Sequence, residues 1–243
     1  MSRAAADRDL CVCFPAAGGG GAPLALMRDA AARLGLTALA LPNAESVTDL
    51  DSGQWERRSV EAIRRAADQG AARRLVLAGH SMGGLSAIRL LPALGVRETR
   101  PIGALVINTP CPDSSGRIPT MSRLPDPEIA RILAHDGFPQ EVLDDENMLA
   151  EIAHGLRGDT VVADRLAERL DPADHLTGLH VLCGRDDRFI PPERCAAWAH
   201  RVSGEFRLTV VPGGHSPDPT WAAALGRALT GVLATTPATK EAA

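Results

Sequence analysis

A serine lies between small residues in Gly79-His80-Ser81-Met82-Gly83, after an apolar run and before a run with helical spacing. The pattern is G-x-S-x-G, and a strand before it and a helix after it are the context in which such a serine is held at a sharp turn as a nucleophile. The glycines at 79 and 83 permit the tight turn that would push the hydroxyl out over a sheet. The alternative is a serine that only caps the helix. The flanking elements favour a nucleophile.

A serine hydroxyl attacks only when a base takes its proton, and the base needs a carboxylate to orient it. Where G-x-S-x-G follows a strand, the order along the chain is serine, acid, then histidine. His215 lies in a Gly-Gly turn after the last strand-like run and is the predicted base. We expect His80 to pack near the turn rather than act in catalysis. The remaining histidines are expected to be surface or core residues: His135, His154, His175, His180 and His200.

Three aspartates are candidates for the orienting acid. Asp186 and Asp187 follow a strand-like run in "VLCGRDDRF", and Asp113 follows the run before it in "NTPCPD". Asp187 is the first choice, because the tip of a strand-ending turn commonly falls three residues after its glycine. Asp186 would then cap or solvate the turn, and Asp113 remains a third candidate.

A tetrahedral intermediate also needs two N–H donors for its oxyanion. The N–H of Met82, directly after the serine, is one predicted donor. The second should come from the loop "FPAAGGGG" at residues 14–21, where glycines let the backbone approach a substrate closely. A phosphate-binding loop is the weaker interpretation, because no Gly-Lys-Ser follows and no acidic residue lies at the right distance.

The elements that must position these residues alternate between strand-like and helix-like runs. Six strand-like runs are predicted at residues 10–14, 37–41, 74–79, 103–108, 179–184 and 206–211, and helical spacing recurs at 24–34, 55–67 and 195–202. Such alternation predicts βαβ units, and hence an α/β protein whose mostly parallel sheet is flanked by helices. Ligands bind at the carboxyl ends of such strands, where the candidate residues lie.

One interval interrupts the alternation. Residues 108–179 contain no convincing strand but several helical patterns, so we predict a helical lid inserted at about 112–176 within a single domain of residues 1–243. A lid shapes a substrate pocket and excludes water. The alternative is that these helices are ordinary ones that pack on the sheet.

Composition narrows the functional classes. The chain has 26 Lys and Arg against 30 Asp and Glu, a net charge of −4, which argues against a general nucleic-acid binder. The five cysteines are odd in number, form no C-x-x-C pair, and are expected to be reduced and mostly buried, with no metal site. No apolar run reaches the roughly 18 residues of a membrane span. We therefore expect a cytoplasmic protein with no membrane association.

Arginine pairs are a further feature of the chain, at residues 57–58, 64–65 and 73–74. They could form a basic face for an acidic partner. Solvated helix faces carry such pairs more often, and Glu56 and Glu61 are close enough in sequence to pair with them.

Together these motifs resemble the type II, or editing, thioesterases of polyketide and nonribosomal peptide assembly lines, which belong to the α/β-hydrolase superfamily. "CFPAAGG", "GHSMGG", "CGRDDRFIPPERCAAW" and "VPGGH" are similar to motifs of that family. The most specific likeness is "HDGFPQEVLDDENMLAEIAHGLRGD", which resembles the family's lid pattern with its Leu-Arg-x-Asp element. The chain departs from the family at Pro42-Asn43-Ala44 and after the histidine, at Ser216-Pro217-Asp218.

The resemblance implies an α/β-hydrolase fold with Ser81 as nucleophile, Asp187 as acid, His215 as base, and Met82 with Ala17 (or Ala16) as oxyanion donors. It implies hydrolysis of acyl groups, short or aberrant, from the phosphopantetheine arm of an acyl or peptidyl carrier protein, with no cofactor. A stand-alone esterase or peptidase, an acyltransferase or cyclase, and a non-catalytic binding module on the same scaffold are the competing functions.

Overall fold

Six strands form one sheet in the order β2-β1-β3-β4-β5-β6, and every neighbouring pair is parallel. The computed structural model describes residues 9–19, 21–95, 100–112, 122–135, 137–170 and 178–236. The strands are β1 (Leu10–Phe14), β2 (Thr37–Ala40), β3 (Leu75–His80), β4 (Ile102–Ile107), β5 (Gly178–Gly184) and β6 (Glu205–Val211). Each predicted strand is present, with ends that differ by one residue or less. The prediction of a mostly parallel sheet is therefore confirmed.

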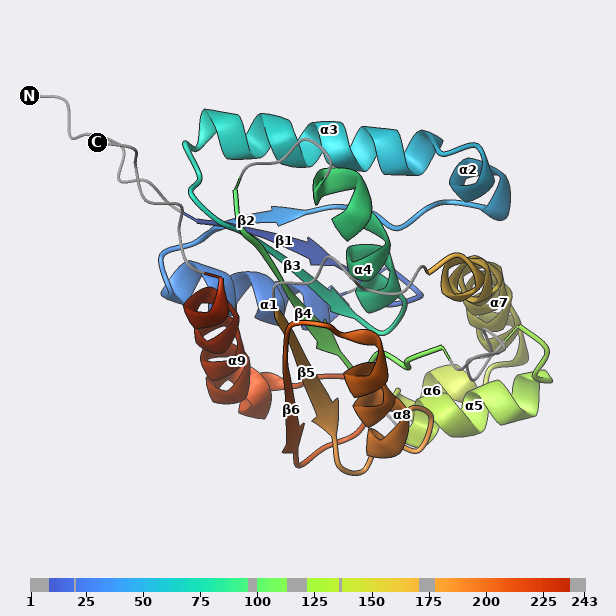
Figure 1. Cartoon of the computed structure of the whole chain (residues 1–243). Coiled ribbons are helices and arrows are strands. Elements are labelled where there is room, and N and C mark those ends of the chain that lie inside the picture. Colours follow the sequence, from blue (N-terminus) through green and yellow to red (C-terminus); the bar gives the residue numbers. More distant parts are fainter. Residues whose placement is uncertain are drawn as a thin grey trace, which may run out of the picture.

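Helices cover both faces of this sheet (Figure 1). On one face lie α1 (Gly21–Arg33) and α9 (Ala222–Thr235), which contact each other and the central strands. On the other lie α3 (Gln54–Gln69), α4 (Met82–Gly95) and α8 (Pro192–Ala196), with α2 (Val47–Asp51) beside α3. The predicted helix at 195–202 is instead the end of α8 followed by a 3₁₀ helix (Ala197–Arg201).

Three helices lie between β4 and β5 in the chain: α5 (Asp126–His135), α6 (Gln140–Leu143) and α7 (Glu146–Glu168). We call them the lid helices. In Figure 1 they gather at one side of the molecule, next to α4 and beyond the carboxyl ends of the strands. Residues 113–121, 136 and 171–176 of the predicted lid lie outside the described residues. The division into one domain with an inserted lid stays a prediction.

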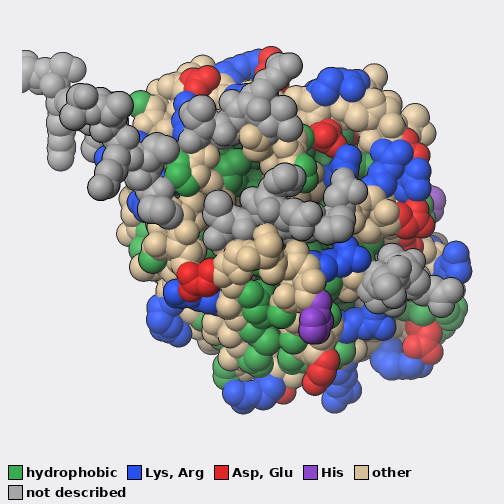
Figure 2. Space-filling model, viewed as in Figure 1, with side chains coloured by type: hydrophobic (Ala, Val, Ile, Leu, Met, Phe, Trp, Pro, Cys, Tyr) green, Lys and Arg blue, Asp and Glu red, His purple; other side chains and the backbone are tan. Residues whose placement is uncertain are grey.

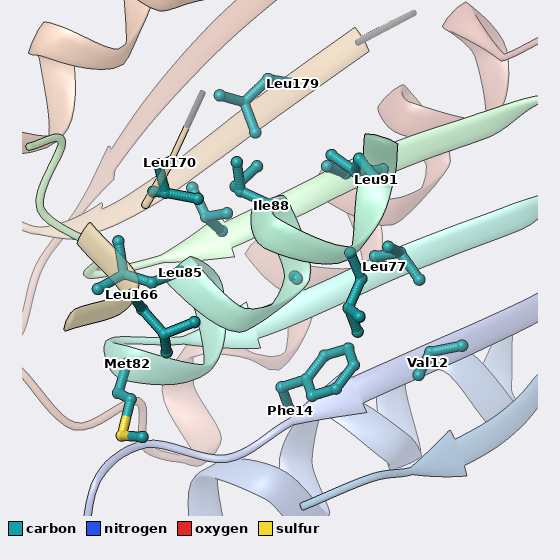
Figure 3. Close-up of a cluster of buried hydrophobic side chains, with 14 of the residues drawn as sticks. Val12, Phe14, Leu77, Met82, Leu85, Ile88, Leu91, Leu166, Leu170 and Leu179 are labelled. Carbon is teal, nitrogen blue, oxygen red and sulfur yellow. The ribbon is translucent and has the colours of Figure 1, made fainter. Parts of the chain in front are cut away.

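The C-terminal half of α7 is part of the main core. Leu166 of α7, together with Leu170 just after the helix, packs with Leu85 and Ile88 of α4 in the buried cluster that also contains Phe14 (Figure 3). Full burial of one such leucine contributes about 1.5–3 kcal/mol to folding. Hydrophobic packing therefore fixes one end of the lid helices to the body of the protein.

Figure 2 shows basic and acidic side chains spread over the viewed face, with hydrophobic atoms gathered near edge strand β6, where Leu208 and Val210 are exposed. No helix in the described part of the chain is long and apolar enough to cross a bilayer. All five cysteines are buried, as predicted, and none of them forms a disulfide.

Candidate active site

Ser81 lies at the sharp turn that joins β3 to α4. Its φ is +55°, a left-handed conformation that non-glycine residues seldom adopt. The turn closes only because small residues surround it: a Cβ atom on Gly79 would lie 2.1 Å from the carbonyl oxygen of Gly83, and one on Gly84 would lie 2.0 Å from Thr109 Oγ1. The Thr109 hydroxyl also donates a hydrogen bond to the Ser81 carbonyl oxygen at 3.1 Å. The strained serine is held by the packing on each side of it.

His215 and Asp187 form a hydrogen-bonded pair beside this turn. The Nδ1–H of His215 donates to Asp187 Oδ2 at 2.7 Å, which makes Nε2 the unprotonated nitrogen of the neutral imidazole. The Asp187 side chain is fully buried. Its other oxygen, Oδ1, accepts hydrogen bonds from the N–H groups of Phe189 at 2.9 Å and Ile190 at 2.7 Å. Three donors therefore fix the orientation of the carboxylate.

The neighbouring carboxylate has a different partner. Asp186 is exposed, and its Oδ2 accepts from the Gly213 N–H at 3.2 Å, while its own N–H donates to the Gly213 carbonyl oxygen at 2.9 Å. Asp186 thus joins the turn after β5 to the turn after β6 without contacting the imidazole through its carboxylate. Asp113, the third candidate, lies outside the described residues.

Asn108 is a residue that the sequence analysis did not select. It is fully buried at the end of β4 with a φ of +44°, which asparagine tolerates better than most residues. Its Nδ2 donates to the carbonyl oxygens of Gly214 and His215, and its Oδ1 accepts from the Gly184 N–H at 2.8 Å. The Asn108 side chain therefore connects the end of β5, which precedes Asp187, to the turn after β6, which contains His215. A polar residue at a strand end was the only sequence signal for it.

His80 also serves this arrangement rather than the chemistry. It is buried, and its Nε2–H donates to the His215 carbonyl oxygen at 2.9 Å, while the two rings lie 5.1 Å apart. Burial, with a further contribution from the charge of His215, lowers the pKa of His80 to about 3. His80 is therefore neutral at physiological pH, and it does not repel a positive charge on His215.

The lowered pKa of His80 predicts a loss of stability in acid. Between its unfolded pKa, about 6.5, and about 3, the unfolded chain binds a proton that the folded protein excludes, so stability falls as pH decreases. In urea unfolding at pH 7 and pH 4.5, the wild type should lose about 2–3 kcal/mol more than His80→Gln. Glutamine keeps an N–H donor for the His215 carbonyl. An equal loss of unfolding free energy in the wild type and in His80→Gln would contradict the lowered pKa of His80.

Of the other histidines, His135 is exposed on α5 and its Nε2 lies 3.0 Å from the Asp186 carbonyl oxygen, and His180 is buried with Nε2 2.9 Å from Thr209 Oγ1. His154 and His200 are exposed, and His175 lies outside the described residues. The arginine pairs have partners within the chain: Arg58 pairs with Asp49, Arg65 with Glu61, and Arg74 with Asp9. These ion pairs favour the interpretation that the arginine pairs lie on solvated helix faces over the interpretation that they form a docking surface.

The predicted oxyanion donors belong to two different parts of the chain, the start of α4 and the turn after β1. Met82 begins α4, so its N–H is at the positive end of a helix. Ala17 lies in the turn after β1, where the Gly19 N–H donates to the Ala16 carbonyl oxygen at 3.3 Å. Ala16, Ala17, Ser81 and Met82 all line one cavity. The catalytic and oxyanion roles of these residues stay predictions.

The cavity has a volume of about 560 Å³ and extends from Ser81 and His215 to the lid helices. Its wall is mainly apolar, and the lid contributes Ile132, Leu133, Phe138, Ile152 and Leu156. The charged residues of this wall, among the described part of the chain, are all acidic: Glu151, Asp159 and Asp164 of α7. The space suits a small, uncharged organic group held against Ser81.

Comparison with protein families matches residues 10–217 to the thioesterase domain. A curated relative, described as a probable cadicidin biosynthesis thioesterase from Streptomyces griseus, is 29% identical over 223 residues, or 87% of this chain. The aligned part spans 59% of that relative's length.

Solved structures share the fold. The RedJ thioesterase of the prodiginine pathway in Streptomyces coelicolor is similar with a TM-score of 0.64 and 24% identity, over 92% of this chain and 87% of that one. The type II thioesterase BorB of the borrelidin biosynthetic cluster is similar with a TM-score of 0.65 and 23% identity, over 93% of each chain. A hydrolase of the α/β superfamily from Xanthomonas campestris gives 0.53 and 18%, over 94% of this chain and 99% of that one. The predicted α/β-hydrolase fold is confirmed.

Proposed function

The chain belongs to the thioesterase domain family, and from this we propose that it hydrolyses acyl groups from the phosphopantetheine thioester of acyl or peptidyl carrier proteins in polyketide or nonribosomal peptide biosynthesis. The observation that carries the proposal is a hydrogen-bonded Asp187–His215 pair whose His215 lines the same cavity as Ser81, which lies at the turn between β3 and α4. The biosynthetic role of the curated relative, as its name states it, supports the pathway class. BorB, described as a type II thioesterase, supports the editing role.

In this mechanism His215 Nε2 takes the proton of Ser81 as Oγ attacks the thioester carbon. The N–H groups of Met82 and Ala17 (or Ala16) stabilise the negative oxygen of the tetrahedral intermediate. Collapse of the intermediate breaks the carbon–sulfur bond, and the thiolate leaves with the electron pair and takes the proton that His215 holds. A water that gives its proton to His215 then attacks the acyl-Ser81 ester, and His215 returns that proton to Ser81 Oγ as the free acid leaves. The chemistry calls for no metal or organic cofactor, since the phosphopantetheine belongs to the carrier. Five buried thiols that form no disulfide agree with a reducing, cytoplasmic setting.

The acidic wall of the cavity predicts selection against charged acyl groups. A malonyl carboxylate would be desolvated close to Glu151, Asp159 and Asp164, with no Lys or Arg among the described residues that line the cavity. Acetyl- and propionyl-loaded carrier protein should therefore be hydrolysed with a kcat/KM about tenfold or more above that of malonyl-loaded carrier, a difference of about 1.4 kcal/mol. Intact-mass spectrometry of the three carriers measures it. A preference for the malonyl group would contradict the prediction.

The proposed function is tested with an acetyl-loaded carrier protein and a p-nitrophenyl ester of the same acyl group. We expect the wild-type enzyme to remove the acetyl mass from the carrier with a higher kcat/KM than it shows toward the ester. An unchanged carrier mass together with ester hydrolysis would identify a stand-alone esterase. Transfer of the acyl group to an added alcohol or amine, seen in the product mass, would identify an acyltransferase or cyclase.

A further inference from the structure

The segment Leu156-Arg157-Gly158-Asp159 of α7 is not used by the mechanism above, yet it makes specific contacts. Arg157 donates to the Leu124 carbonyl oxygen at 2.8 Å and pairs with Asp126, so it braces α7 against the start of α5. Two residues on, Asp159 Oδ2 accepts a hydrogen bond from the N–H of Gly18 at 2.7 Å. Asp159 is 141 residues away from Gly18 in sequence, and it is a residue of a lid helix that contacts the loop of the predicted oxyanion donor.

The first half of that loop, at Phe14 and Pro15, is fixed by the body of the protein. A Cβ atom on Gly83 would lie 2.4 Å from the carbonyl oxygens of both residues, so β1 and α4 are in close contact there. Asn43 adds a hydrogen bond from its Nδ2 to the Pro15 carbonyl oxygen at 2.9 Å, and the Ser86 hydroxyl holds Asn43 Oδ1 at 2.8 Å. None of these contacts depends on the lid helices.

The second half of the loop is different. Gly18 and Gly19 have φ values of +85° and +88°, and the turn they form is closed by the weak bond from the Gly19 N–H to Ala16. Glycine reaches many backbone conformations at little cost in energy, so the glycines of this turn do not by themselves hold it in one conformation. A hydrogen bond to a carboxylate is short and about twice as strong as a neutral one. Asp159 supplies such a bond to the residue directly after Ala17.

We propose that Asp159 is a positioning residue that fixes the N–H of Ala17 (or Ala16) in the oxyanion hole, and that it makes the shape of this hole depend on the seating of the lid helices. The inference rests on the proposed serine hydrolase chemistry, but not on the identity of the acyl carrier. When α7 is seated, its carboxylate holds Gly18 and the donor N–H faces Ser81. When α7 moves away, the glycine turn loses this constraint and the hole loses one donor.

The test compares Asp159→Ala and Asp159→Asn with the control His135→Ala. His135 makes another hydrogen bond from a lid helix, to the Asp186 carbonyl oxygen, but it does not line the cavity. His135→Ala therefore removes a contact between α5 and the body of the protein, while the bond from Asp159 of α7 to the Gly18 N–H stays in place. Three quantities are measured for each variant: kcat and KM on a p-nitrophenyl ester, and the inhibition constant of phenylboronic acid. The boronic acid binds Ser81 Oγ as a tetrahedral anion that occupies the oxyanion hole.

For Asp159→Ala we expect kcat to fall by about 10- to 100-fold, below the full effect of a lost oxyanion donor, with KM changed by less than about threefold. The boronate inhibition constant should rise by the same factor as kcat falls. Asp159→Asn keeps an oxygen acceptor, so its kcat and its boronate inhibition constant should be close to those of the wild type. For His135→Ala, both values should stay within about threefold of the wild type.

Equal effects of Asp159→Ala and His135→Ala would overturn the proposal, because they would show that the loss of any lid contact has this effect and that the Asp159–Gly18 bond has no specific role. A rise in KM alone, with kcat and boronate binding unchanged, would also overturn it. Because the ester and the boronate need no carrier protein, these results stand even if the wild-type enzyme fails to hydrolyse acyl-carrier thioesters. That failure would count against the proposed function alone.

Discussion

Alanine in place of Ser81 is expected to lower kcat for thioester hydrolysis by about four to six orders of magnitude, as removal of a serine nucleophile does in other hydrolases. Without Oγ, His215 has no hydroxyl to deprotonate and no acyl-enzyme can form. The rate is measured as thiol released from an acetyl-pantetheine thioester, and the variant should also fail to react with a fluorophosphonate. Loss of less than about tenfold would mean that Ser81 is not the nucleophile.

Ser81→Gly provides the matched control for folding. It lacks the nucleophile as Ser81→Ala does, but glycine relieves the strain of the φ of +55° at this position. We expect Ser81→Gly to be inactive and up to about 1 kcal/mol more stable to urea than Ser81→Ala. An inactive variant with raised stability shows that activity is lost through chemistry, because unfolding would lower stability instead.

Asparagine in place of Asp187 should lower kcat by about 10⁴, the effect of the same change in a serine-histidine-aspartate triad. The N–H groups of Phe189 and Ile190 require an acceptor at Oδ1, so the asparagine amide must turn its NH₂ group toward His215. That NH₂ group donates to Nδ1 of the imidazole, which places the remaining ring proton on Nε2. The histidine then has the wrong tautomer to take a proton from Ser81.

The adjacent Asp186→Asn is the control for this change. It alters the same turn and removes the same charge, but Asp186 holds the Gly213 N–H rather than the imidazole, and an asparagine oxygen can still accept that bond. We expect a kcat within about tenfold of the wild type. A larger loss from Asp186→Asn than from Asp187→Asn would reverse the assignment of the acid.

Local sequence was enough to predict the strands, the turn that carries Ser81 and the strand-end positions of Asp187 and His215. Buried parallel strands appear as short apolar runs, and a G-x-S-x-G turn needs its glycines within four residues of one another, so neighbours along the chain carry this information. The fold class follows from the same alternation. The extent of the helix at 195–202 was less well predicted, because periodicity does not distinguish an α-helix from α8 continued by a 3₁₀ turn.

The tertiary structure decided which groups meet. Asp186 and Asp187 are adjacent and chemically identical. Only the direction of each side chain in the folded turn decides that Asp187, and not Asp186, is hydrogen-bonded to the imidazole of His215. Asn108 connects three strand ends that are far apart in sequence, and Asp159 reaches Gly18 across 141 residues. No local pattern encodes such contacts, because they depend on how the sheet and the lid helices pack, whereas the sequence by itself determines the turns and strands that carry the reacting groups.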